Sequence, residues 1–269
     1  MHTAPLKPRK RLGQHFLHDK NIIRKIVDAV RATPEDVVVE IGPGTGALTE
    51  ELVRRFSRLT VIEVDERAVK LLRERFPDLD IRHQDILEVN WRALAAEKGG
   101  ALYVVGNLPY YITSPILFRL FEARQVLKEA VLMMQLEVAQ RLVALPGTKQ
   151  YGILSVITQL VAEPELLFKV SPNVFYPKPD VWSAVVRLRF KNVLEVPLDK
   201  LKKVVRTAFN QRRKTLRNSL KPIVQETGRP VPESLAGKRA EALHPEEFVA
   251  LTRYFYLEEA GEKQMQNLL

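Results

Sequence analysis

The four residues Asn107-Leu108-Pro109-Tyr110 have side chains and carbonyl groups that could position an amino group attached to a nucleobase. Such an amine is a weak nucleophile, because its lone pair is delocalised into the ring. The Asn107 side-chain oxygen and the Leu108 carbonyl oxygen could accept its two hydrogens and favour a pyramidal nitrogen. Pro109 lacks a backbone donor and fixes φ, and the ring of Tyr110 could stack on a base. The motif predicts methyl transfer to an exocyclic amine, although Asn and Pro are also ordinary turn residues.

A glycine-rich turn upstream, Glu40-Ile41-Gly42-Pro43-Gly44-Thr45-Gly46, predicts a cofactor site. A dinucleotide-binding turn has the spacing G-x-G-x-x-G and offers backbone N–H groups to a pyrophosphate. Here the spacing is G-x-G-x-G, Pro43 lacks a donor, and the acidic Glu40 precedes the turn. These differences favour a cationic ligand without phosphates, namely S-adenosylmethionine, with Glu40, Gly42 and Gly44 among its contacts.

Three further acids lie at or just after the ends of expected strands. Glu63 comes about 20 residues after the glycines, where a carboxylate accepts hydrogen bonds from ribose hydroxyls. Asp65 lies one step past the strand end, so we favour Glu63 for this role. Asp85 could accept from the adenine amino group of the cofactor, or it could simply cap the turn before Ile86. Each acid alone is a weak signal, but the ordered set of Gly42, Glu63, Asp85 and Asn107, each at an expected strand end, is a strong one.

The elements that must position these residues alternate between strands and helices. Asp19 is expected to cap the first helix, and the β-branched run 37–41 is typical of a strand buried on both faces. This alternation predicts a doubly wound α/β domain, whose ligands bind beyond the carboxyl ends of its strands. The expected strands are 37–41, 59–64, 79–82, 102–106, 130–135 and 183–188, and the expected helices after the first are 47–56, 66–76, 113–121 and 136–145.

The pattern changes in the later part of the chain. Four prolines between Pro164 and Pro179 predict a stiff loop, and the segment from Leu198 onward is helical and basic. We therefore expect two domains, with a basic arm and the α/β domain in residues 1–192 and a small helical domain in residues 193–269.

The charge distribution predicts a polyanionic partner. The formal net charge is +10, and residues 200–221 contain nine basic residues and no acid. A solvated helix face normally mixes both signs, so we expect this run and the basic N-terminal arm to contact nucleic-acid phosphates. The candidate contacts are Lys10, Arg11, Arg206, Arg212, Arg213, Lys214 and Arg217.

The composition excludes several classes of protein. The chain has no cysteine, which rules out disulfides, thiolate nucleophiles and cysteine-bound metals. No apolar run approaches the roughly 18 residues of a membrane span, and the basic N-terminus has no apolar segment after it. We expect a cytoplasmic monomer that needs no metal.

Four motifs, in their order along the chain, resemble those of the KsgA-type ribosomal RNA adenine dimethyltransferases. They are Gly13-Gln14-His15-Phe16-Leu17, the glycine turn, Asn107-Leu108-Pro109-Tyr110 and Phe175-Tyr176-Pro177-Lys178-Pro179. The string Phe209 to Leu216 resembles the small-subunit enzymes more than the related Erm methyltransferases. The resemblance implies a Rossmann-like class I methyltransferase fold with a C-terminal helical domain that binds rRNA.

The resemblance also implies an activity and further site residues. The family uses S-adenosylmethionine to dimethylate N6 of two adjacent adenosines near the 3′ end of small-subunit (16S) rRNA, on the assembling small subunit. His15 and Leu17 would line the cofactor with Gln14 beside them, and Phe175 would stack on the target adenine opposite Tyr110. Tyr111 stands where a smaller polar residue is expected, which leaves the shape of the pocket open.

Three other functions stay open from the sequence. The first is an Erm-like enzyme that acts on large-subunit rRNA, which mapping of the methylated position would identify. The second is an assembly factor that acts mainly by binding, which rescue by an Asn107→Ala protein would favour. The third is a nicotinamide-dependent oxidoreductase, which the glycine spacing disfavours.

Overall fold

The computed structural model describes residues 6–9 and 12–257, which form two compact units. Among the described residues, the first unit contains those up to 143 together with 161–192, and the second contains 144–160 and 193–257. The expected boundary assigned residues 144–160 to the first domain, whereas their contacts group them with the second unit. Sequence order concealed this, because the chain leaves the first unit after Val143 and returns to it for its last strands.

A seven-stranded sheet forms the centre of the first unit, in the order β4-β3-β2-β5-β6-β9-β7. The β4, β3, β2, β5 and β6 strands are parallel, and β9 lies antiparallel between β6 and β7. The strands are β2 (Val37–Ile41), β3 (Arg58–Glu63), β4 (Asp80–His83), β5 (Leu102–Asn107), β6 (Leu127–Gln135), β7 (Ala162–Val170) and β9 (Ser183–Phe190). This is the predicted doubly wound α/β architecture.

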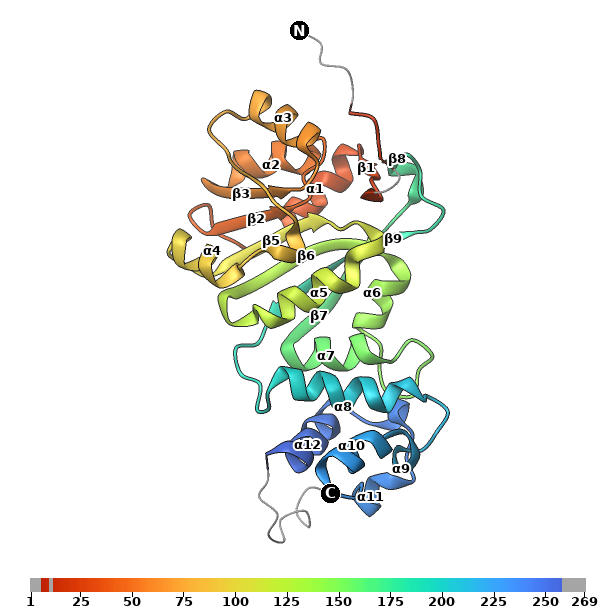
Figure 1. Cartoon of the computed structure of the whole chain (residues 1–269). Helices are drawn as coiled ribbons and strands as arrows, with labels where there is room; N and C mark the ends of the chain where they lie inside the picture. Colours follow the sequence, from red (N-terminus) through yellow and green to blue (C-terminus); the bar gives the residue numbers. More distant parts are fainter. Residues whose placement is uncertain (1–5, 10–11, 258–269) are drawn as a thin grey trace. The chain divides into compact units, whose positions relative to one another are not determined.

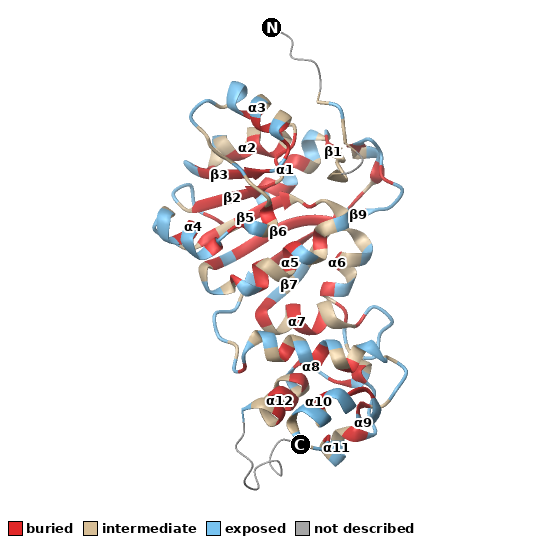
Figure 2. Cartoon of the chain, viewed as in Figure 1, coloured by how far each residue is buried: buried red, intermediate tan, exposed pale blue. Residues whose placement is uncertain are grey.

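Helices cover both faces of the sheet (Figure 1). On one side are α1 (Lys20–Ala29), α2 (Ala47–Arg55) and α3 (Glu66–Arg75), and on the other are α4 (Trp91–Lys98) and α5 (Thr113–Glu122). Apolar residues of α1 and α2 pack on every second residue of the strands, such as Val38, Val61 and Val105. All five β2 residues are buried, as expected for a strand covered on both faces (Figure 2).

The start of the first helix follows directly from its sequence. The side chain of Asp19 accepts hydrogen bonds from the backbone N–H groups of Asn21 and Ile22, 2.9 and 3.0 Å long. These bonds satisfy two of the free donors at the helix N-terminus. Asp19 is thus the predicted cap of α1.

The proline-rich segment differs from the expected loop in its first part. Residues 162–170 form β7, with Pro164 inside it. A proline cannot donate to a sheet ladder and is therefore confined to edge strands, and β7 is an edge of this sheet. The rest of the segment contains the short strand β8 (Phe175–Tyr176), which pairs antiparallel with β1 (Phe16–Leu17).

The second unit is helical. Its elements are α7 (Ile153–Val161, whose last residue belongs to the first unit), α8 (Leu198–Asn210), α9 (Leu216–Ser219), α10 (Lys221–Thr227), α11 (Glu233–Ala236) and α12 (Pro245–Tyr256). Its core includes Phe209, which stacks on Phe248 with 5.8 Å between ring centroids. The short helix α6 (Leu136–Leu142) belongs to the first unit. Among residues 6–9 and 12–257, no helix is both long and apolar enough to cross a bilayer.

Candidate active site

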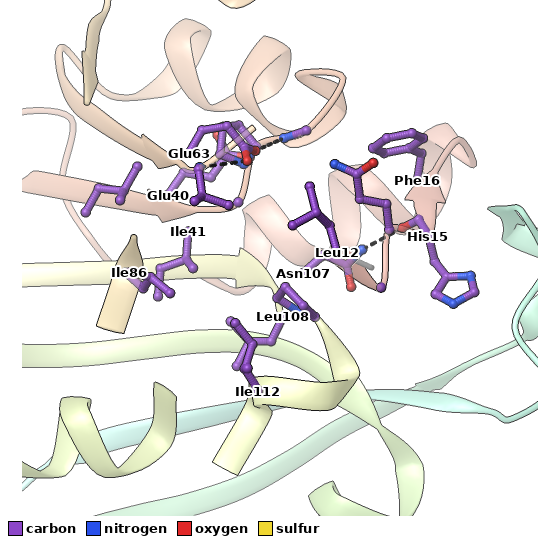
Figure 3. A pocket seen from close by; sticks show the side chains of 18 of the residues that line it. Leu12, His15, Phe16, Glu40, Ile41, Glu63, Ile86, Asn107, Leu108 and Ile112 are labelled. Atoms are coloured by element: carbon purple, nitrogen blue, oxygen red, sulfur yellow. Dashed lines mark hydrogen bonds between the residues drawn. The ribbon is translucent and has the colours of Figure 1, made fainter. Parts of the chain in front are cut away.

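A cavity of about 290 Å³ lies at the carboxyl ends of β2, β3 and β5, where the strand order of the sheet reverses (Figure 3). This is where a doubly wound sheet binds its ligands. The structure brings together here all the residues predicted to contact the cofactor and the whole Asn107 motif. They are Gln14, His15, Leu17, Glu40, Gly42, Gly44, Glu63, Asp85, Asn107, Leu108, Pro109 and Tyr110.

The glycine turn forms one wall of the cavity with a backbone that other residues rarely adopt. Gly42 and Gly44 have φ values of +63° and +55°, a region that favours glycine. A Cβ on Gly44 would also lie 3.0 Å from the ring of Phe16. The turn therefore needs glycine both for its conformation and for contact with the N-terminal stretch.

Glu40 is a buried carboxyl group in the cavity wall. It is 1% exposed, and its Oε2 accepts a 2.7 Å hydrogen bond from the Thr49 hydroxyl. Burial raises the pKa of Glu40 to about 8, the Thr49 bond partly offsets this, and the nearby Glu63 raises it further. The group is therefore largely protonated at neutral pH, and a cation in the cavity would stabilise its charged form.

Glu63 is held in place by the backbone around it. Its carboxylate accepts hydrogen bonds of 2.9 to 3.0 Å from the N–H groups of Gly44, Val64 and Asp65. Burial nevertheless raises the pKa of Glu63, against the effect of these bonds. A carboxylate fixed in this way at the end of β3 is in the place expected for a ribose contact.

Asp65, the competing acid, does not line the cavity and is engaged elsewhere. Its carboxylate bonds to the guanidinium of Arg67 and accepts a 2.9 Å bond from Gln14 Nε2. Burial would raise the pKa of Asp65, but the hydrogen bonds from Arg67 and Gln14 outweigh it and hold the pKa at about 2. Asp65 is thus ionised at neutral pH and anchors the N-terminal stretch, a role that its position in the sequence does not indicate.

Asp85 lines the cavity and also caps a turn. Its Oδ1 accepts a 2.9 Å bond from the Leu87 N–H, at the start of the 3₁₀ turn Ile86–Glu88. The capping role that the sequence left open is therefore present. Asp85 Oδ2 accepts no hydrogen bond from any part of the chain that the structure describes, so the carboxylate retains an acceptor.

Residues 12–17 form a wall of the cavity and are held there by side-chain and backbone hydrogen bonds. Gln14 bonds to Asp65, and its Oε1 accepts a 2.9 Å bond from the Arg9 N–H. The His15 carbonyl accepts a 3.0 Å bond from Asn107 Nδ2, and His15 Nδ1 donates a 2.7 Å bond to the Pro177 carbonyl. His15 thus joins the Asn107 motif to the loop that follows β8.

The Asn107 motif presents two acceptors at the cavity wall. Because Nδ2 of Asn107 donates to the His15 carbonyl, the orientation of the amide is fixed. Within the described residues, neither Asn107 Oδ1 nor the Leu108 carbonyl oxygen accepts a hydrogen bond. The ring of Tyr110 stacks on His15 with 5.4 Å between centroids, and its hydroxyl lies 2.6 Å from Ser183 Oγ. Burial raises the pKa of Tyr110.

Phe175 lies in the core and not at the cavity, where the resemblance places it. It does not line the cavity, it is 3% exposed, and it belongs to the hydrophobic core between the sheet and α1. Pairing of β8 with β1 sets Phe175 opposite Leu17 and turns its ring inward. In this structure the ring is enclosed by the core, and its stacking on the target adenine opposite Tyr110 stays a prediction.

Some of the basic side chains predicted to contact phosphates are already bonded to other groups of the protein. Lys10 and Arg11 lie outside the described residues. Arg212 bonds to Glu241 at 2.7 Å and to the carbonyls of Lys149 and Thr148, so its guanidinium is used inside the second unit. Arg217 pairs with Glu233 at 2.7 Å. Arg206 is exposed, but it also interacts with another group of the protein.

Arg213 and Lys214 lie in the turn after α8 and form no ion pair within the described residues. Acids from distant segments thus neutralise part of the acid-free run, which the local sequence could not reveal. Ser183, whose hydroxyl meets Tyr110, was also missed. Its only signal is a polar residue at the first position of a buried strand.

The chain is similar to proteins that are named as rRNA methyltransferases. A family model described as ribosomal RNA adenine dimethylase matches residues 6–256. A Salinibacter ruber protein named ribosomal RNA small subunit methyltransferase A is 56% identical, over 94% of this chain and 86% of its own. A Bacteroides thetaiotaomicron protein of the same name is 44% identical, over 92% of this chain and 93% of its own.

Solved structures agree on the fold. A Plasmodium falciparum dimethyladenosine transferase superposes with a TM-score of 0.75 at 24% identity, over 89% of this chain and 98% of that one. The 23S rRNA methyltransferase ErmE gives a TM-score of 0.65 at 28% identity, over 89% of this chain and 99% of that one. The family model spans both units, and the chain therefore belongs to the ribosomal RNA adenine dimethylase family.

Proposed function

We propose that this protein uses S-adenosylmethionine to dimethylate N6 of two adjacent adenosines near the 3′ end of small-subunit (16S) rRNA. It acts as a cytoplasmic monomer on the assembling small ribosomal subunit. Family membership supports the reaction. The relatives at 44 to 56% identity carry a small-subunit name, whereas the large-subunit enzyme ErmE is 28% identical. These figures favour small-subunit rRNA as the substrate.

The observation that carries this proposal is the pair of acceptors, Asn107 Oδ1 and the Leu108 carbonyl oxygen. Both residues line the cavity, and neither oxygen has a hydrogen-bond donor within the described residues. An exocyclic amine has two hydrogens to donate. Its nitrogen is planar because the lone pair is delocalised into the ring, and it must become pyramidal before it reacts. Two fixed acceptors can bind it and aim its lone pair in one step, and this positioning is the largest contribution that the chain can make.

The cavity fits S-adenosylmethionine. Three acids line it (Glu40, Glu63 and Asp85), and no Lys or Arg is among its described lining residues. A dinucleotide pyrophosphate would meet this excess of negative charge without a cation to neutralise it. A sulfonium and an ammonium would instead stabilise the buried carboxyl groups, whose pKa values are raised in the free protein. When bound, S-adenosylmethionine supplies a methyl group activated by the positive sulfur.

The remaining chemistry belongs to the residues around the amine. Asn107 and Leu108 accept the N6 hydrogens, and His15 holds the Asn107 amide so that Oδ1 is the free end. Tyr110 is fixed on its face by His15 and at its hydroxyl by Ser183. The proton lost from N6 leaves through these polar acceptors or through water.

The Asn107→Ala variant tests the assignment. Removing the side-chain acceptor should lower turnover by about 100-fold or more, with little change in affinity for rRNA. Transfer of labelled methyl groups to small subunits that lack the modification measures turnover, and mass spectrometry of both rRNAs maps the methylated position. A variant with the normal rate would refute the role of Asn107, and a product in large-subunit rRNA would refute the substrate.

A further inference from the structure

Three exposed aromatic residues are chain neighbours of Tyr110 or of the residues that hold it. The chain has 11 Phe, 2 Trp and 7 Tyr residues, all within the described part, and only Tyr111, Tyr176 and Trp182 among them are exposed. Their exposed fractions are 57%, 67% and 51%. Exposed apolar side chains that gather near a binding cavity often mark a site of interaction.

Each of the three is a sequence neighbour of a group that contacts Tyr110 or His15. Tyr111 follows Tyr110, and its ring packs so close to Gly13 that a Cβ there would lie 2.9 Å away. Trp182 precedes Ser183, whose hydroxyl is 2.6 Å from that of Tyr110. Tyr176 precedes Pro177, whose carbonyl bonds to His15, the residue stacked on Tyr110.

The backbone that carries these rings is fixed. Tyr176 lies opposite Phe16 in the β1–β8 pair. The carbonyl of Trp182 accepts a 2.8 Å bond from the Leu136 N–H, and β9 begins at the next residue. Tyr176 and Trp182 are therefore presented by a strand pair and a bonded turn, which lowers the entropy lost when a ligand binds.

We infer that Tyr111, Tyr176 and Trp182 form an aromatic rim on which unpaired bases next to the target adenosine stack. The inference rests on the proposed function and adds a binding surface for the strand that carries the substrate. Base stacking on aromatic side chains tolerates any sequence and is a standard way to hold single-stranded RNA. Lys178, two residues after Tyr176, is exposed and has no ion pair within the described residues, so it is free to meet a phosphate.

The two tryptophans make the test direct. Trp91 is 3% exposed and Trp182 is 51% exposed, so a Trp91→Phe protein reports on Trp182 alone. The probe is an RNA hairpin with two adjacent adenosines in its loop and unpaired nucleotides beside them. A second hairpin carries abasic sites at those flanking positions. Stacking should quench the Trp182 fluorescence with the first hairpin and much less with the second.

The affinities of variants for the two hairpins then show how much Trp182 and Tyr176 each contribute to RNA binding. Trp182→Ala and Tyr176→Ala should weaken binding of the first hairpin by about 5-fold or more each and abolish its advantage over the abasic hairpin. Trp182→Phe should retain most of the affinity. Leu145→Ala, which removes an exposed apolar side chain of the second unit, is the matched control and should bind both hairpins normally.

Unchanged binding in both alanine variants, or no difference between the hairpins for the unsubstituted protein, would overturn the aromatic rim. If the alanine variants bind both hairpins normally but bind whole small subunits more weakly, the aromatic rim is overturned. That result would indicate that these side chains contact a protein partner. Methylation of small subunits by the unsubstituted protein is measured in parallel. If the hairpin experiments refute the aromatic rim but the unsubstituted protein methylates small subunits normally, the proposed function stands. If the unsubstituted protein does not methylate them, the proposed function itself is refuted.

Discussion

The buried carboxyl group of Glu40 links ligand binding to protonation. Its raised pKa, about 8, results from burial and from the neighbouring Glu63. The free protein therefore carries a proton there at neutral pH, and a cationic ligand in the cavity favours its release. A buried acid of this kind is a common mark of a functional site.

We predict that S-adenosylmethionine binds more tightly as the pH rises toward 8 and that binding releases protons. Calorimetry in buffers of different ionisation enthalpy measures that release. Glu40→Gln should bind more weakly and without this pH dependence. An affinity of the unsubstituted protein that stays constant over this range would contradict the prediction.

The raised pKa of Glu40 also predicts how the stability of the protein depends on pH. The folded pKa lies above the usual 4.5, so the folded state binds more protons between these values. Stability from this group is present at low pH and is lost as the pH rises through about 8. Glu40→Gln should remove that part of the slope in urea unfolding.

The fate of individual site residues shows what local sequence can and cannot predict. Glu40, Glu63 and Asn107 were predicted to meet because parallel strands end at one edge of a sheet, and they line one cavity. The position of Phe175 depends on pairing with Leu17, far away along the chain. No local pattern reveals that pairing. The residue type alone favours a core position for Phe175, and the expected place beside Tyr110 came from the resemblance.

Residues 12–17 act as an element of the site although they contain only the two-residue strand β1. Their attachments run to Asp65, Asn107 and Pro177, which come from three separate segments. His15 takes part in two of the three and also stacks on Tyr110. The N-terminal stretch therefore fixes the geometry of the amine acceptors from outside the sheet.

We predict that His15→Ala lowers turnover by about 10-fold, since it removes one hydrogen bond and one ring contact. His15→Asn should restore part of the loss, because its side-chain N–H can donate to the Pro177 carbonyl. Separate kcat and KM values for S-adenosylmethionine and for small subunits measure the effect. Equal kcat values for the Ala variant and the unsubstituted protein would remove His15 from the positioning role.

At the level of whole elements, strong periodicity predicted most of the sheet. The buried run of β2 and the cap of α1 are where the sequence placed them. The edge strand β7 was missed because Pro164 suggests a loop, and only the sheet order shows that this position tolerates proline. The helix α4 was missed as well, and its mixed composition over Trp91–Lys98 gives little periodic signal.

The turn after α8 contains adjacent arginines with opposite expected roles. Arg212 bonds to Glu241 and to two carbonyls of residues 148–149, whereas Arg213 has no ion pair within the described residues. We predict that Arg212→Ala lowers the melting temperature by several degrees. Arg213→Ala should leave it unchanged and weaken binding to small subunits instead. The reverse pattern in thermal unfolding and binding assays would contradict this division.

For the molecule as a whole, the strength of RNA binding depends on how many basic side chains are available to phosphates. The net charge of +10 predicts strong nonspecific attraction to RNA. Part of the run 200–221 is already paired, with Lys203 bonded to Glu226, Arg212 to Glu241 and Arg217 to Glu233. The number of basic residues therefore overstates how many phosphates this run can bind.

We predict that binding to small-subunit rRNA weakens steeply with salt, and that the slope identifies which cations take part. Each cation removed from a phosphate should reduce the slope of log K against log salt by about 0.7 to 0.9. Arg213→Gln with Lys214→Gln should therefore lower it by about 1.4 to 1.8. Arg217→Gln, whose partner Glu233 already neutralises it, should change the slope little. Affinities measured from about 50 to 200 mM salt provide the slopes. An equal reduction by Arg217→Gln would mean that surface ion pairs open to bind phosphate, in which case the full basic run contributes after all.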